Sequence, residues 1–107
     1  MSTEAFDANR DHRISREEAA SLVQTFQSRA GAGEHRSSTF NRAAFERLLG
    51  QPGAAGIRIY RAHHENGSPT LVMVAVDAAG QDLATTDALF MQKGTDCPPY
   101  CVTQSWL

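Results

Sequence analysis

The sequence predicts an α+β domain in which two N-terminal helices pack on a small antiparallel β-meander of three to four strands. Three observations lead to this prediction. Apolar residues recur at helical spacing in two stretches that precede residue 51. Two runs rich in β-branched residues then flank Asn66-Gly67, which is the strongest short-range signal for a β-hairpin. Shorter apolar runs, separated by turn residues, follow the hairpin and extend the predicted sheet.

The first helix is predicted to begin at Ser15. Ser15 and Glu18 have the spacing of a capping box, in which each side chain binds a backbone N–H that the helix leaves free. Glycine-rich residues 30–33 end the helix, and residues 34–39 are predicted to form a polar loop. The apolar stripe of this helix consists of Ala19, Leu22, Val23 and Phe26.

The second helix is predicted to have Asn41 as its N-cap, because an asparagine side chain accepts hydrogen bonds from the first free N–H groups of a helix. Phe40 before the cap and Phe45 after it are spaced for a hydrophobic staple. Gly50 is the predicted stop at the C-terminal end of this helix.

The predicted hairpin covers residues 56–77. A two-residue turn at Asn66-Gly67 would pair Tyr60 with Met73 and Ile59 with Val74. This register divides the hairpin into an aliphatic face, which we expect the helices to cover, and a second face. The second face consists of Tyr60, Ala62, Leu71, Met73 and Ala75.

The chain beyond the hairpin is predicted to complete the meander. Residues 77–80 have turn chemistry, and Leu83 and residues 88–91 indicate a third and a fourth short strand. Residues 14–107 are therefore expected to form a single α+β domain, preceded by a polar segment at residues 1–13.

The composition limits the classes of function. The 107 residues are 41% hydrophobic and 21% charged, which is typical of one globular domain. A net charge of −2 provides no basic field for nucleic acid or anionic lipid, and no apolar run approaches the roughly 18 residues of a membrane span. The N-terminus lacks the basic start and apolar stretch of a signal peptide. We therefore expect a cytoplasmic protein with neither a nucleic-acid nor a membrane partner.

Several short motifs occur in one order along the chain. Among them are Gly56-Ile-Arg-Ile-Tyr60, Val76-Asp-Ala-x-Gly80-x-Asp82 and Cys97-Pro-Pro-x-Cys101. Together they resemble a family of short, uncharacterised bacterial hypothetical proteins over roughly residues 14–101. The resemblance implies a shared domain, and it implies no catalytic residues because no activity is assigned to that family.

Residues 7–18 carry the clearest chemical signal in the sequence. An EF-hand loop places oxygen ligands at positions 1, 3, 5, 7, 9 and 12 and an apolar residue at position 8, because a hard cation needs several oxygens that converge from one tight turn. Residues 7–18 resemble this loop, with Ile14 at the apolar position. The calcium ligands would be Asp7, Asn9, Asp11, the carbonyl of Arg13, Ser15 and Glu18.

Three features depart from an EF-hand. Position 6 is His12 instead of glycine, only residues 1–6 remain for an entering helix, and no second loop is visible to complete a pair. In the alternative interpretation, Ser15 and Glu18 cap the helix and the acidic residues before them form a solvated turn. Calcium is the candidate cofactor, and no cofactor is certain.

Cys97 and Cys101 enclose Pro-Pro-Tyr, and a local disulfide or two free thiols are the first expectations. A zinc site would need two further ligands, of which His63 and His64 could supply at most one because adjacent strand residues point to opposite faces. A thiol-redox role is a further alternative, although the spacing is one residue longer than in thioredoxin-like sites. Histidines in polar segments, His35 among them, are expected to be exposed.

The second face of the hairpin is a candidate interaction surface for a protein partner or for a homodimer. Its large side chains are Tyr60, Leu71 and Met73. The alternative is that C-terminal aromatic residues fold over this face, namely Phe90, Tyr100 and Trp106.

The sequence contains no motif for a catalytic nucleophile, a phosphate-binding loop or a dinucleotide site. It therefore predicts a small non-enzymatic binding or interaction protein of unknown partner. A calcium-binding module is the alternative, and a zinc-binding or thiol-redox role through Cys97 and Cys101 is the second alternative.

Overall fold

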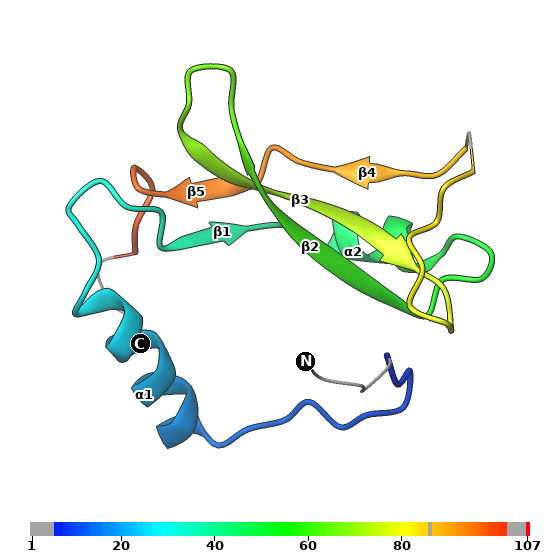
Figure 1. Cartoon of the computed structure of the whole chain (residues 1–107), viewed down its shortest axis with the longest axis horizontal. Coiled ribbons are helices and arrows are strands. Elements are labelled where there is room, and N and C mark those ends of the chain that lie inside the picture. Colours follow the sequence, from blue (N-terminus) through cyan, green and yellow to red (C-terminus); the bar gives the residue numbers. More distant parts are fainter. Residues whose placement is uncertain (1–5, 86, 103–106) are drawn as a thin grey trace.

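A computed structural model describes residues 6–85, 87–102 and 107 of the chain. The described residues form two helices and five strands. The strands belong to two antiparallel sheets, one with the order β2-β3-β4 and the other with the pair β1-β5 (Figure 1). In chain order the elements are α1 (Arg16–Gln27), β1 (Ser37–Thr39), α2 (Arg42–Leu49), β2 (Gly56–His63), β3 (Pro69–Val76), β4 (Phe90–Met91) and β5 (Thr95–Cys97).

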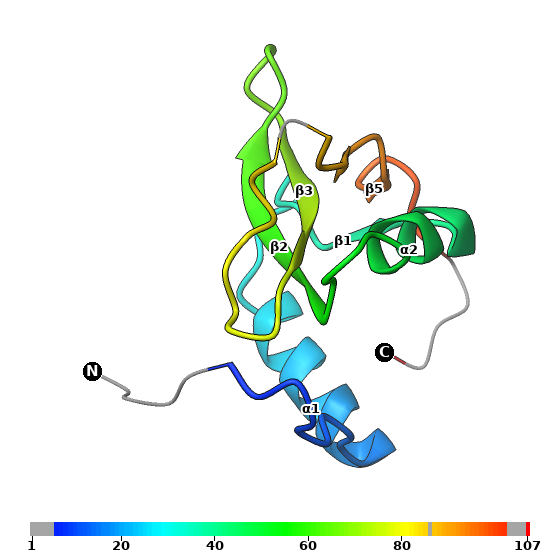
Figure 2. The same ribbon diagram turned by 90° about the vertical axis from the view of Figure 1, so that its right-hand side faces the viewer.

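The predicted packing of two N-terminal helices on one meander is wrong. β1 lies between the helices along the chain and pairs with β5, so part of the predicted polar loop at residues 34–39 is a strand. α2 packs on all three strands of the larger sheet. In contrast, α1 buries none of its residues. It lies to one side of that sheet in Figure 1 and extends below the lower end of the sheet in Figure 2, so it does not cover a face of the sheet. A strand of three residues is too short for the sequence to show its periodicity.

Both predicted N-caps are confirmed. The Glu18 N–H donates to the Ser15 hydroxyl over 3.0 Å, and the Ala44 N–H donates to the side-chain oxygen of Asn41 over 3.0 Å. These bonds satisfy backbone donors that have no partner inside the helix.

No helix in the described part of the chain is both long and apolar enough to cross a membrane.

The hairpin is present as predicted, but its register differs by one residue. The Gly67 N–H donates to the His64 carbonyl over 2.9 Å, and the His64 N–H donates to the Ser68 carbonyl over 2.8 Å. Gly67 has a φ of 87°, which glycine adopts without a steric penalty. These contacts define a longer loop at residues 65–67, in which a type I turn is followed by a glycine bulge, instead of the predicted two-residue turn.

The change in register places the side chains of β3 on the opposite face relative to those of β2, because a shift of one residue moves every side chain of a strand to the other side. Ile59 pairs with Met73 instead of Val74. The face that α2 covers therefore carries Met73 and Ala75, which form the core with the fully buried Leu48 of α2. The partly buried residues around this core are Phe40, Ala44, Ala54, Ile57, Leu83 and Met91.

The chain after the hairpin forms one predicted strand and one that was not predicted. β4 lies within residues 88–91, where the sequence indicates a strand. Leu83 belongs to no strand, although its neighbour Asp82 makes an isolated bridge with Val76. β5 ends at Cys97, the first residue of the cysteine motif, and its pairing with β1 gives the molecule its second sheet.

Phe6 packs against two glycines at one end of the larger sheet. A Cβ atom added to Gly80 would lie 2.7 Å from the Phe6 Cβ, and one added to Gly56 would lie 3.0 Å from the Phe6 ring. Gly80 also has a φ of 81°. The N-terminal polar segment therefore contacts the domain through this side chain.

Gly80→Ala should lower the free energy of unfolding by about 2 kcal/mol, since alanine disfavours a positive φ and Phe6 must move to admit the added methyl group. Urea denaturation measures this change. Gly31→Ala is the matched control, because its added Cβ atom would meet nothing within 4 Å. A loss no larger than that of the control would contradict the packing of Phe6 on Gly80.

Candidate functional site

Asp96 lies where the two sheets meet. It pairs with Ser38 across β1 and β5, and the Ser38 hydroxyl donates to its Oδ1 atom. His64, which follows β2, has its Nε2 atom 3.3 Å from Oδ2 of Asp96. The Asp96 side chain is only 14% exposed. One carboxylate therefore connects the smaller sheet to the hairpin.

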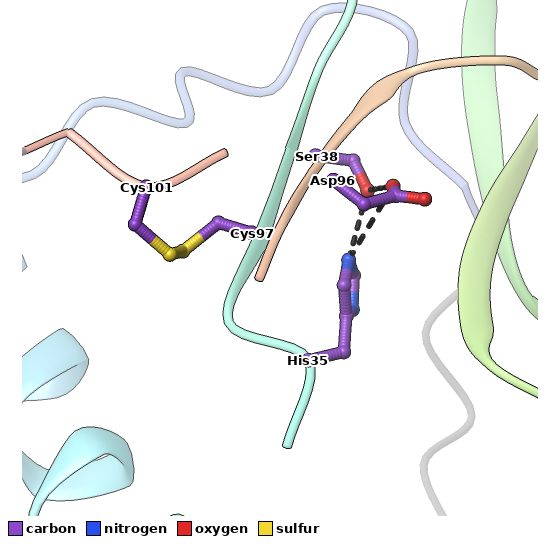
Figure 3. The surroundings of a disulfide bond; sticks show 5 residues. All are labelled: His35, Ser38, Asp96, Cys97 and Cys101. Carbon is purple, nitrogen blue, oxygen red and sulfur yellow. Dashed lines mark hydrogen bonds and ion pairs between the residues drawn. A yellow bond between two sulfur atoms is a disulfide. The ribbon is translucent and has the colours of Figure 1, made fainter. Parts of the chain in front are cut away.

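The hydrogen bonds around Asp96 all run toward its carboxylate. An ionised carboxylate only accepts, so the single hydroxyl proton of Ser38 points to Asp96. The Nε2 atom of His35 lies 2.8 Å from the Ser38 Oγ and must therefore donate to it (Figure 3). Thr70, which is 3% exposed, also lowers the pKa of Asp96, and it accepts from the Gln92 amide over 3.3 Å.

This arrangement keeps Asp96 ionised at neutral pH. Burial raises the pKa of its carboxyl group, but hydrogen bonds from Ser38, His64 and Thr70 stabilise the charged form and lower the pKa by more. The pKa of Asp96 consequently lies below its ordinary value of 3.8. A negative charge is thus held at the junction of the sheets.

A cleft of about 390 Å³ opens beside this carboxylate. The described residues that line it include no lysine, arginine or glutamate. Its polar lining consists of His35, His64, Ser68 and Asp96. Its apolar wall consists of Pro69, Pro98, Pro99 and Tyr100. The cleft therefore combines one buried anion with ring-shaped apolar surfaces.

Cys97 and Cys101 form a disulfide with a Cα–Cα distance of 4.7 Å, so the structure has the local disulfide and not the two free thiols. The residues between them belong to the apolar wall of the cleft, which the bond therefore holds in place. Figure 3 shows the disulfide and the Asp96 carboxylate on opposite sides of β5, as expected because Cys97 and Asp96 are neighbours on this strand.

Zinc binding through these cysteines would require that the disulfide be reduced, because only a thiolate is a zinc ligand. Among the residues that the structure describes, no three histidines, cysteines or carboxylates are placed to hold a metal ion. His64 faces Asp96 instead of the sulfur atoms, and the neighbouring His63 is exposed. A zinc or thiol-redox role stays a prediction.

The predicted calcium loop is largely extended and leads into α1 (Figure 1). Asp7 Oδ1 accepts the Asn9 N–H over 2.9 Å, and Asp11 Oδ1 accepts the Arg13 N–H over 3.0 Å. The Asp11 carboxylate also pairs with the Arg13 guanidinium at 2.7 Å, which lowers the pKa of Asp11. The last two predicted ligands, Ser15 and Glu18, belong to the N-cap of α1. Arg13 would have to release Asp11 before that carboxylate could bind calcium, so calcium binding stays a prediction.

The residues of the candidate interaction surface do not form one surface. Met73 is 1% exposed in the core, and Leu71 lies half-buried on the same face of the sheet. Tyr60 lies on the opposite face, is 45% exposed and donates its hydroxyl proton to Asp82. This hydrogen bond raises the pKa of Tyr60. The register of the hairpin is the reason for the separation.

The alternative in which C-terminal aromatic residues cover the hairpin also differs from the structure. Phe90 and Tyr100 are 63% and 71% exposed, so neither is buried against a sheet. Trp106 lies outside the described residues.

Sequence reasoning missed the Asp96 cluster. Ser38 and Asp96 are separated by 58 positions, and no motif joins them. His35 was expected to be exposed, yet its side chain is only 18% exposed because β1 brings it against β5. The cysteine motif is the one sequence signal that lies next to this cluster.

Comparisons with known proteins identify no relative of this chain. No family model matches the chain, and neither a curated protein nor a solved structure matches it. The resemblance to short bacterial proteins therefore stays a prediction, and the chemistry of the cleft is the basis for a functional proposal.

Proposed function

We propose that this chain is a small non-enzymatic binding protein whose cleft beside Asp96 holds a guanidinium or primary ammonium group. The direction of the hydrogen bonds in the cleft is the observation that supports the proposal. Ser38 and His64 both donate to Asp96, so these donors are not available to a ligand, and the cleft offers a ligand mainly acceptors. A cationic group that only donates hydrogen bonds matches such a lining.

The acceptors that remain can be named. In the tautomer of His35 and His64 that donates through Nε2, the Nδ1 atom is an acceptor. An ionised carboxylate has about four acceptor positions, and the hydrogen bonds from Ser38 and His64 leave some of them open on Asp96. A guanidinium, with its five N–H donors, is the best match to these positions.

The apolar wall suits the rest of such a ligand. The aliphatic stems of arginine and lysine pack on apolar surfaces while their charged ends stay hydrated. Pro98 and Pro99 provide such a surface, and the exposed ring of Tyr100 provides an aromatic face for the cation. We therefore propose an arginine or lysine side chain of a partner protein, or a free alkyl cation, as the ligand.

The same hydrogen bonds support a binding role over catalysis. In Ser-His-Asp catalysis the serine donates its proton to a histidine, which the carboxylate orients. Here Ser38 donates directly to Asp96 and accepts from His35. Removal of the Ser38 proton would place two negatively charged oxygens side by side, which opposes its use as a nucleophile.

n-Butylguanidinium should bind in the cleft, whereas n-butylurea, which has a similar shape and no charge, should not. An NMR titration at pH 7 should show shifts of the Ser68, Asp96 and Tyr100 amides with the cation alone. Asp96→Asn should weaken binding by at least about tenfold, because it removes a charged acceptor. A peptide with one arginine, compared with its citrulline analogue, distinguishes a protein side chain from a free cation.

Two further variants keep this test decisive. Tyr100→Ser alters an exposed side chain, so the variant should fold normally and bind the cation several-fold more weakly. Asp87→Asn removes an exposed carboxylate that does not line the cleft, and it should bind normally. Equal shifts with the neutral urea, or undiminished binding by both cleft variants, would overturn the proposal.

The cleft is proposed for the oxidised protein. Disulfides are rare in the cytosol, so the cytoplasmic location expected from the sequence would leave Cys97 and Cys101 as thiols. The apolar wall would then lose the covalent bond that closes it.

A further inference from the structure

β2 lies at an edge of the three-stranded sheet, so one side of its backbone has no neighbouring strand. His64 and Ser68 form a hydrogen-bonded pair at the end of the hairpin. Hydrogen-bonded pairs alternate along an antiparallel ladder, so every second residue of β2 points its N–H and C=O away from β3. These residues are Ile57, Ile59, Arg61 and His63. In the described part of the chain, no other backbone segment bonds to them.

The side chains of these same residues form a basic and apolar strip, because residues two apart on a strand share a face. Ile59 is 53% exposed, and Arg61 and His63 are exposed beside it. The structure describes no ion pair or hydrogen bond for the side chain of Arg61 or His63. β2 contains no aspartate or glutamate of its own.

We infer that the edge of β2 binds an extended acidic segment of a partner protein as an additional strand. The backbone of the segment would pair with the four outward-facing residues, which is how exposed sheet edges recognise peptides. Alternate side chains of the segment would lie beside Ile59 and Arg61. The expected motif is therefore an apolar residue and an acidic residue two positions apart.

Charge favours an acidic partner over a second copy of this chain. Two β2 strands placed side by side would bring the arginines and histidines of both copies onto one strip that contains no carboxylate. The edge is also separate from the cation cleft, because no residue of β2 lines that cleft. The two proposals can therefore fail independently.

The test uses the peptide acetyl-Thr-Val-Thr-Glu-Thr-Val-Thr-amide and a control peptide with lysine in place of glutamate. NMR-detected hydrogen exchange should show that the acidic peptide slows exchange of the Ile57, Ile59 and Arg61 amides. Arg61→Glu should weaken binding of the acidic peptide by about tenfold and favour the lysine peptide. Arg29→Glu changes charge equally at an exposed position outside β2 and should bind the acidic peptide normally.

Two results would overturn the inference. The first is equal binding of the acidic and lysine peptides, or binding that leaves exchange of the three amides unchanged. The second is slow exchange of those amides without peptide, together with a dimer in sedimentation, since a second copy would then occupy the edge. Arg61 is exposed, so the fold of its variant is expected to persist, and the amide spectrum checks this directly.

Discussion

Replacement of Met73 by glutamate should abolish the folded state. Met73 is 1% exposed and packs with Leu48 and Ala75 in an apolar core. Burial of an unpaired charge costs at least about 3 kcal/mol, and the lost packing of the methionine adds about 2 kcal/mol. A domain of this size has a total stability of only about 5 kcal/mol, so the variant should be unfolded at 25 °C. Circular dichroism and urea denaturation measure the outcome.

Tyr60→Glu is the matched control for this prediction, because a two-residue turn would pair Tyr60 with Met73 on one face. In the structure Tyr60 lies on the opposite face and is 45% exposed. Its replacement removes the hydrogen bond to Asp82 and should lower the free energy of unfolding by about 1 kcal/mol. Equal losses of stability in the two variants would favour the two-residue turn over the observed register.

Asp96→Asn should produce the second large loss, about 3 kcal/mol at pH 7. The carboxylate accepts from Ser38 and His64, whereas an asparagine side chain would present an NH₂ group in place of one of the two accepting oxygens. A hydrogen-bond donor that faces this NH₂ group would lose its acceptor, and water could not easily replace the acceptor because the Asp96 side chain is only 14% exposed. Because the bonds join the two sheets, we expect a lower unfolding temperature without a change of fold. Thermal unfolding followed by circular dichroism measures the difference.

The effect of Asp96 on stability should depend on pH with a defined sign. Its pKa is lowered in the folded protein relative to the ordinary value of 3.8. A lowered pKa contributes stability above the unfolded value, and this contribution disappears as the pH falls below 3.8 toward the folded value. The difference between wild type and Asp96→Asn should therefore be largest at neutral pH and shrink in acid.

The matched control is Asp87→Asn, which removes an exposed carboxylate at another position of the same part of the chain. It should leave both the unfolding temperature and the acid limb of the stability curve close to those of wild type. A constant difference between wild type and Asp96→Asn from pH 7 to pH 3 would contradict the hydrogen-bonded carboxylate.

The features that the sequence predicted correctly are local. Ser15 and Asn41 cap their helices because each interaction spans only three residues and depends on no distant partner. The hairpin was predictable for the same reason. Turn residues between two β-branched runs favour a hairpin regardless of what the rest of the chain packs against. Its register was not, because Asn66-Gly67 fits both a two-residue turn and the longer loop with the bulge at Gly67.

Local sequence patterns could not predict the candidate site. Ser38 lies in a strand of three residues, which shows no periodicity, and its partner Asp96 is 58 positions away. Nothing in either segment marks them as neighbours. Prediction of this cluster would have required the pairing of β1 with β5, and that pairing also brings His35 out of the solvent.

By itself, the sequence determined the helices, their caps and the existence of the hairpin, because short-range hydrogen bonds and side-chain alternation set them. Only the tertiary structure decided which face of the hairpin is the core, since one additional loop residue moves Met73 to the side that α2 covers. The tertiary structure also decided that Asp96 is the centre of a site. Its charge is held by donors from separate strands, and only their packing brings those donors to one carboxylate.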